Sequence, residues 1–191
     1  MPDVRSEFTP AWWLPGAHLQ TIWPALMHRR PRIAIEWERL ELDDGDFLDL
    51  AWSGPRHGDI VLLLHGLQGS IRSHYAVGLM HELAQLGMRS CLMHFRGCGR
   101  GSNRLPISYH SGKTDDPQAT LEHVEHRHGR RVFGAIGVSL GGNVLLKWLA
   151  ERGTDSHLQR AVAISVPFRL DDAARRLERG VSRLYQRHLV S

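Results

Sequence analysis

The order of apolar and turn-forming segments predicts an α/β fold, with a mostly parallel sheet covered by helices on both faces. Short apolar stretches typical of buried strands alternate with stretches whose apolar residues recur at helical spacing. Residues 59–64 are continuously apolar after Asp59, as expected of a central parallel strand. Residues 131–136 form a second, mostly apolar stretch, which runs into a glycine-flanked serine and then a helical pattern. Functional residues of such folds lie at the carboxyl ends of the strands.

The first strands are predicted to form a hairpin. Residues 33–42 and 47–52 alternate between apolar and polar side chains, and the Asp-Asp-Gly-Asp of 43–46 is typical of the turn between them. The later elements are predicted in this order: a helix ending near Gly87, a strand at 89–95, a helix with Asp116 as N-cap and Pro117 first that runs to His128, a helix from Gly141 to near Gly153, a buried strand at 159–166, and a helical segment at 171–190.

A tryptophan- and proline-rich arm, residues 8–31, precedes the hairpin. Its prolines interrupt regular structure, whereas Trp12, Trp13 and Trp23 are expected to be buried. One interpretation is an arm laid across the core. The alternatives are one wall of an acyl pocket, or a patch on a membrane surface where the arginines at 29, 30 and 32 meet anionic headgroups.

The serine between the second apolar stretch and its helix lies in a G-x-S-x-G motif, from Gly137 to Gly141. In a strand-turn-helix context this motif is typical of a nucleophile elbow, where the two glycines avoid collisions with the neighbouring strand and helix. Ser139 is therefore the candidate catalytic nucleophile. The alternative is a turn that serves packing alone.

Acyl transfer also requires two backbone N–H groups to bind the oxyanion. The motif offers Leu140, and the loop that follows residues 59–64 offers Leu67, with Gly66 easing a close approach. His65 stands before that glycine, and we expect it to support the loop instead of acting as the general base.

Composition limits the function classes. The 191 residues carry a formal charge of +4 and two cysteines, Cys91 and Cys98. No apolar run is long enough for a transmembrane helix and the first residues do not resemble a signal peptide, so we expect a cytoplasmic protein. The arginines are scattered among acids without a nucleic-acid-binding motif, which argues against nucleic acid as a partner.

No cofactor or metal site is predicted. The glycines of residues 96–103 alternate instead of following the dinucleotide spacing, and Pro106 prevents a helix from starting there. His123, His126 and His128 share one predicted helix without a matching carboxylate pattern, so we expect them on a solvated face.

These motifs resemble the α/β-hydrolase superfamily, and within it the YheT-like group, AB-hydrolase family four. The resemblance spans nearly the whole chain and is carried by the following segments: residues 13–22, His65 to Ser70 with Ser73-His74-Tyr75, Phe95 to Cys98, Tyr109 to Gly112 with Thr114 to Asp116, and Gly137 to Asn143. It implies a hydrolase of carboxylic esters, with short-chain or lipid acyl esters as substrates. It also implies Ser139 as nucleophile, with Leu67 and Leu140 as oxyanion donors.

The chain departs from the family pattern after the serine. In this fold the acid and the histidine of the triad follow at the ends of later strands, but the residues after Ser139 supply one predicted strand and the start of a lid-like segment at 171–191. We therefore expect a single domain, residues 1–191, that is the amino-terminal part of a longer hydrolase and lacks the last strands. The positions of the triad acid and histidine are not matched by His157, His188, Asp171 or Asp172, since none of them follows such a later strand. The alternative to a hydrolase is a non-catalytic binding module.

Overall fold

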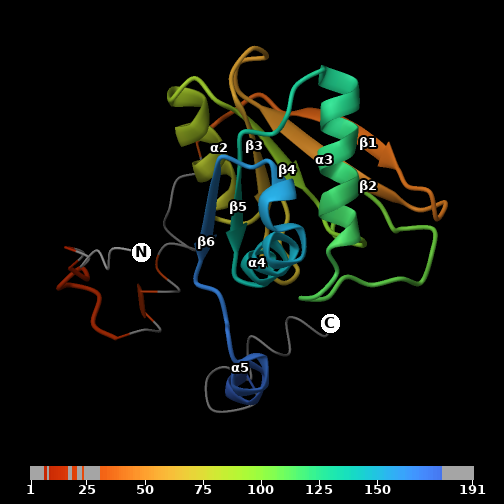
Figure 1. Ribbon diagram of the computed structural model, residues 1–191. Coiled ribbons are helices and arrows are strands. Elements are labelled where there is room, and N and C mark those ends of the chain that lie inside the picture. The colour runs from red at the N-terminus through yellow and green to blue at the C-terminus, as the bar shows by residue number, and fades with distance from the viewer. Residues whose placement is uncertain (1–6, 8, 17–18, 21–22, 24–30, 178–191) are drawn as a thin grey trace.

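The computed structural model describes residues 7, 9–16, 19–20, 23 and 31–177 (Figure 1). Its centre is a six-stranded sheet in the order β1-β2-β4-β3-β5-β6. The strands are β1 (Glu36–Glu41), β2 (Phe47–Ser53), β3 (Ile60–Leu64), β4 (Arg89–Met93), β5 (Gly134–Val138) and β6 (Arg160–Ile164). The strands β4, β3, β5 and β6 are parallel, and the β1–β2 hairpin is antiparallel. The predicted hairpin and mostly parallel sheet are confirmed.

Helices cover both faces of this sheet, as predicted. The helices are α2 (Ala76–Gln85), α3 (Asp115–His128), α4 (Leu140–Arg152) and α5 (Leu170–Leu177), with a 3₁₀ turn at Gly153–Ser156. Figure 1 shows α3 and α4 in front of the sheet and α2 behind it. One core cluster joins alternate strand residues to Val124, Val144 and Trp148 of α3 and α4, and the second joins the opposite residues to Met80 of α2.

The strand at 159–166 was predicted to be buried, and this prediction is wrong. All five residues of β6 are exposed, including Val162 at 48% and Ile164 at 37%. β6 pairs only with β5 among the described strands, so it is an edge strand with uncovered apolar side chains. An apolar sequence alone cannot distinguish a central strand from an edge strand, because both have the same local pattern.

The predicted burial of the arm tryptophans is also wrong. Trp12 is 92% exposed, Trp13 50% and Trp23 42%, and Trp13 packs edge-on against Trp23 with ring centroids 5.3 Å apart. Residues 8, 17–18, 21–22 and 24–30 of the arm lie outside the described residues, as do residues 178–191 of the lid-like segment. No described helix is long and apolar enough to cross a membrane.

Candidate functional site

Ser139 lies on the sharp turn between β5 and α4. Its backbone has φ 52° and ψ −116°, outside the conformations that a serine normally adopts. The Ser139 N–H donates to the Ile164 carbonyl at 2.8 Å, while its own carbonyl accepts from the N–H groups of Gly142 and Asn143 at 2.9 and 3.1 Å. These bonds anchor the strained turn to β6 on one side and to the first turn of α4 on the other.

The two motif glycines are required because neighbouring backbone approaches them closely. A Cβ on Gly137 would lie 2.5 Å from the Gly141 carbonyl oxygen. A Cβ on Gly141 would lie 2.4 Å from the carbonyl oxygen of Leu64, the last residue of β3. The start of α4 is therefore packed directly against the end of the central strand.

That packing brings the loop after β3 beside the serine. A Cβ on Gly66 would lie 3.4 Å from Ser139 Cβ, so the two predicted segments meet in space. Within the described part of the chain, the N–H groups of Leu67 and Leu140 donate no hydrogen bond. Both belong to backbone next to Ser139, and Leu140 is the first residue of α4, where N–H groups have no acceptor in the helix.

Two tyrosines hold the loop on either side of Leu67, and the sequence did not reveal this role. The Gly66 N–H donates to the Tyr75 hydroxyl at 2.9 Å, and the Gln68 N–H donates to the Tyr109 hydroxyl at 2.6 Å. The N–H of Leu67 is left between two amides that are already bonded. Both tyrosines belong to segments that carry the family resemblance, which was the available signal, but that resemblance did not assign them a partner.

His65 and His94 brace the same loop reciprocally. His65 follows β3, and its Nε2 accepts from the Phe95 N–H at 3.1 Å, so the proton is on Nδ1, which donates to the Gly66 carbonyl at 2.7 Å. His94 follows β4, and its Nε2 accepts from the Ile71 N–H at 3.1 Å. His65 is 1% exposed, and desolvation lowers its pKa to about 4. Both ring nitrogens of His65 are engaged, which leaves neither available as a base for Ser139.

Arg96 anchors the loop that leaves β4. Its guanidinium binds Asp116 through Nε and Nη2, at 2.8 to 3.2 Å, and Nη1 binds Asp44 at 2.6 Å and Asp46 at 3.2 Å. The prediction of Asp116 as N-cap is wrong, because α3 begins at Asp115 with Thr114 as N-cap. The Asp116 carboxylate is bonded to Arg96, so it pairs a buried cation instead of capping the helix.

No described side chain hydrogen-bonds to the Ser139 hydroxyl, neither a histidine nor an acid. His157 precedes β6 and therefore lies at the amino end of that strand, opposite the end where Ser139 lies. Asp171 and Asp172 are on α5 and pair with arginines of the same segment. His188 is outside the described residues.

The predicted solvated histidine face of α3 is wrong for two of its three residues. His123 pairs with Glu38 at 2.8 Å, and the His128 ring lies 4.9 Å from Trp52. His126 is exposed. The β1–β2 hairpin covers this side of α3, and nothing in the helix sequence identifies which surface a distant hairpin will cover. No described group of three or more His, Cys, Asp or Glu side chains is placed to hold a metal ion.

Comparison with known proteins agrees with this architecture. The family model of the alpha/beta hydrolase fold matches residues 59–189. The chain is 41% identical over 190 residues to the Escherichia coli protein named "Putative esterase YheT", covering 97% of this chain and 56% of that protein. It is 27% identical over 187 residues to "Phospholipase ABHD3" of Mus musculus, covering 93% of this chain and 46% of that protein. The chain thus spans about half the length of these curated relatives.

Solved structures show the same fold. An esterase of Pyrococcus furiosus superimposes with a TM-score of 0.65 at 21% identity, covering 83% of this chain and 61% of that chain. The sheet order, the glycine-flanked Ser139 turn and the family-model match together lead to one assignment. The chain belongs to the alpha/beta hydrolase fold family.

Proposed function

We propose that this chain supplies the nucleophile and the oxyanion-binding half of a serine hydrolase that acts on carboxylic esters. Ser139 is the nucleophile, and the N–H groups of Leu67 and Leu140 bind the oxyanion. The observation that carries the proposal is the strained Ser139 turn, with two N–H groups on adjoining backbone that donate to no described acceptor. A carbonyl attacked by the serine develops negative charge where such donors, and the positive end of the α4 dipole, stabilise it.

The remaining parts of the mechanism follow from the geometry around this serine. A base must remove the hydroxyl proton as the bond to the carbonyl carbon forms, and no described residue is placed to do so. His65, Gly66, Gly137 and Gly141 act by positioning: the glycines permit the close approach, and His65 holds the loop. The general base and its acid are therefore assigned to a part of the protein other than the described residues.

The proposed substrate class is short-chain or lipid acyl esters, and the names of relatives support the lipid esters. Their names include phospholipase and monoacylglycerol lipase. The competing proposal is a binding module that keeps the fold without catalysis. It predicts that Ser139 does not react even in a longer counterpart that contains the whole fold.

A fluorophosphonate probe tests the proposal. In a full-length counterpart we expect labelling that Ser139→Ala abolishes and that Ser165→Ala leaves intact. Ser165 is a matched control because it also has a positive φ, 52°, at the end of a strand. Labelling that persists in Ser139→Ala contradicts the assignment. The 191-residue chain itself should turn over esters slowly, because no described histidine is placed beside Ser139, and a serine triad without its histidine loses on the order of 10⁶ in kcat.

We further propose that the tryptophan-rich arm contacts a lipid surface. The 92% exposure of Trp12 and the neighbouring Trp13 support this, since amphipathic aromatic rings favour the membrane interface. Binding of the purified chain to vesicles of anionic phospholipid should weaken in Trp12→Ala but not in Trp37→Ala, which lies on β1. Equal binding by both variants would show that the arm does not contact the lipid surface.

The proposed compartment is the cytoplasm. Cys91 is buried, Cys98 is half-buried, and both are free thiols, as a reducing compartment would leave them. Cell fractionation tests this, and recovery in an oxidising compartment would contradict it.

A further inference from the structure

A polar cavity lies at the opposite end of the sheet from Ser139. Its volume is about 540 Å³, and it lies between the β1–β2 hairpin, the first residue of β4 and the last turn of α3. Arg89 begins β4 and pairs in register with Ile60 at the amino end of β3, whereas Ser139 follows the carboxyl end of β5. The cavity is therefore separate from the ester-hydrolysis site.

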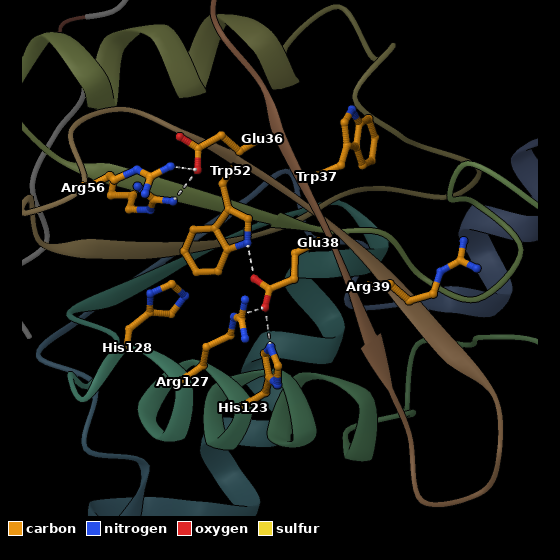
Figure 2. Close-up of a pocket in the computed structure, with 10 residues that line it drawn as sticks. Glu36, Trp37, Glu38, Arg39, Trp52, Arg56, His123, Arg127 and His128 are labelled. Atoms are coloured by element: carbon orange, nitrogen blue, oxygen red, sulfur yellow. Dashed lines mark hydrogen bonds and ion pairs between the residues drawn. The ribbon is translucent and has the colours of Figure 1, made fainter.

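Trp52 and the carboxylates of Glu36 and Glu38 hold the charged side chains of the cavity in place. Figure 2 shows His123, Arg127 and His128 extending from α3 toward Glu38 and Trp52 of the hairpin. Glu38 accepts from Trp52 Nε1 at 2.9 Å and from His123 at 2.8 Å, and it pairs with Arg127 at 2.7 Å.

Positive charge exceeds negative charge in this lining. Glu36 pairs with both Arg56 and Arg89, each at 3.2 Å. The fourth lining arginine, Arg39, is paired with Asp49 outside the cavity. Three arginines therefore share the two glutamates, and both carboxylates are already engaged. A cation would meet an excess of like charge here.

Two buried nitrogen atoms in the same lining have no hydrogen-bond partner within the described part of the chain. They are Arg89 Nε and His128 Nε2. Arg89 is only 5% exposed. Both side chains contact the Trp52 ring: the Arg89 Cζ atom is 5.0 Å from its centroid and the His128 ring 4.9 Å. An unpaired buried donor of a charged group is costly, so this arrangement favours a bound acceptor.

The chemistry of these atoms selects the ligand. Arg89 Nε–H can only donate, and His128 Nε2 donates when it carries its proton. An apolar ligand would leave both unsatisfied. A water molecule would satisfy the hydrogen bonds without balancing the charge, whereas a phosphate group offers several acceptor oxygens and negative charge together.

We propose that this cavity is a binding site for a compact phosphate group, free or carried on a small molecule, held by Arg89 Nε and His128 Nε2 with Arg56 and Arg127 at the rim. The rim arginines are 74% and 62% exposed and can turn toward an incoming anion. The site does not depend on ester hydrolysis at Ser139, because it lies at the other end of the sheet.

Calorimetric titration of the purified chain with inorganic phosphate, at constant ionic strength, tests the proposal. We expect saturable binding that weakens at least about tenfold, or about 1.4 kcal/mol, in Arg89→Lys and in His128→Phe. The lysine keeps the charge and the phenylalanine keeps a ring against Trp52, so each removes mainly the unpartnered nitrogen. Arg72→Gln, an exposed arginine outside this cavity, is the matched control and should bind as the original chain does.

Two further measurements complete the test. The ¹⁵N shift of His128 Nε2 should move on titration and saturate with the same affinity. A second titration with glycerol 2-phosphate separates a free-phosphate site from one that accepts a phosphomonoester, and binding of either supports the proposal. The absence of saturable binding of both at tens of millimolar, or unchanged affinity in His128→Phe, would overturn it. His128→Phe decides the matter if Arg89→Lys does not fold.

Discussion

At the scale of the residue, Gly141 allows the start of α4 to pack against β3, and this packing places the candidate nucleophile Ser139. The Gly141 α-carbon lies so close to β3 that a methyl group would sit 2.4 Å from the Leu64 carbonyl oxygen and 2.5 Å from that of His65. These are backbone atoms of the last residue of β3 and the residue that follows it, and they cannot move aside as a flexible side chain can. Gly78 of α2 offers the opposite case, since a methyl group there would meet nothing within 4 Å.

We therefore expect Gly141→Ala and Gly78→Ala to change the free energy of unfolding in opposite directions. Gly141→Ala should lower the free energy of unfolding by about 3 kcal/mol, through overpacking against fixed backbone. Gly78→Ala should raise it by about 0.5 to 1 kcal/mol, because alanine has the higher helix propensity. Urea denaturation measures both free energies. Equal effects would show that the backbone contact at Gly141 does not exclude an alanine there.

At the scale of the element, the loop after β3 is held by partners from three other segments. Tyr75 is the N-cap residue of α2, Tyr109 belongs to the loop before α3, and Phe95 follows β4. The buried His65 lies at the centre of this arrangement and contacts His94, whose pKa is also lowered by desolvation. The loop should therefore loosen when either imidazole is forced to take up a proton.

The stability of the protein should consequently fall in mildly acidic solution. The folded-state pKa of His65, about 4, is below the ordinary value of about 6.5, so this group's contribution is complete above pH 6.5 and is lost as the pH falls toward 4. The expected loss is about 3 kcal/mol. In His65→Gln the free energy of unfolding should depend less on pH over this range, with His94 responsible for part of the remainder.

The control for this prediction is His74→Gln, because His74 is an exposed histidine next to the same loop. It should keep the full pH dependence. Chemical denaturation at a series of pH values between 7.5 and 4.5 measures all three proteins. A His65→Gln profile parallel to that of the original chain would contradict the burial argument.

At the scale of the whole molecule, the two edges of the sheet differ. The β1 edge belongs to a hairpin whose Glu36 and Glu38 are held by ion pairs and hydrogen bonds to β2, β4, α3 and Arg56. No described element covers the outer edge of β6, and Phe168 and Leu170 beyond it are 80% and 47% exposed. An apolar strand with free N–H and C=O groups favours pairing with another strand.

We therefore expect the 191-residue chain to self-associate in solution and to bind a hydrophobic dye. Val162→Lys, at a position that is 48% exposed, should reduce both, since charge on an edge strand opposes pairing. Arg152→Lys, on exposed α4 surface, is the control. Light scattering after size-exclusion chromatography measures the mass. A monodisperse monomer with a sharp melt and no dye binding would contradict this expectation.

Local patterns in the sequence were sufficient for most elements. The hairpin, the central strand β3, and the turn at Ser139 with its following helix lie where they were predicted, within a few residues at their ends. Periodicity and glycine placement act over a few neighbouring residues, so they can be read from the chain directly. The convergence of Gly66 and Ser139 followed from one topological rule, that parallel strands end at the same edge of a sheet.

Tertiary structure alone decided which distant residues meet. The bonds of Gly66 to Tyr75 and of Gln68 to Tyr109, and the use of Asp116 by Arg96, join residues that no local pattern relates. The same holds for α3, whose histidine face is covered by a hairpin distant in the sequence. It also holds for β6, because its apolar sequence does not indicate which strands will be its neighbours. Burial depends on what the rest of the chain places alongside a segment, and that is settled only when all the elements pack.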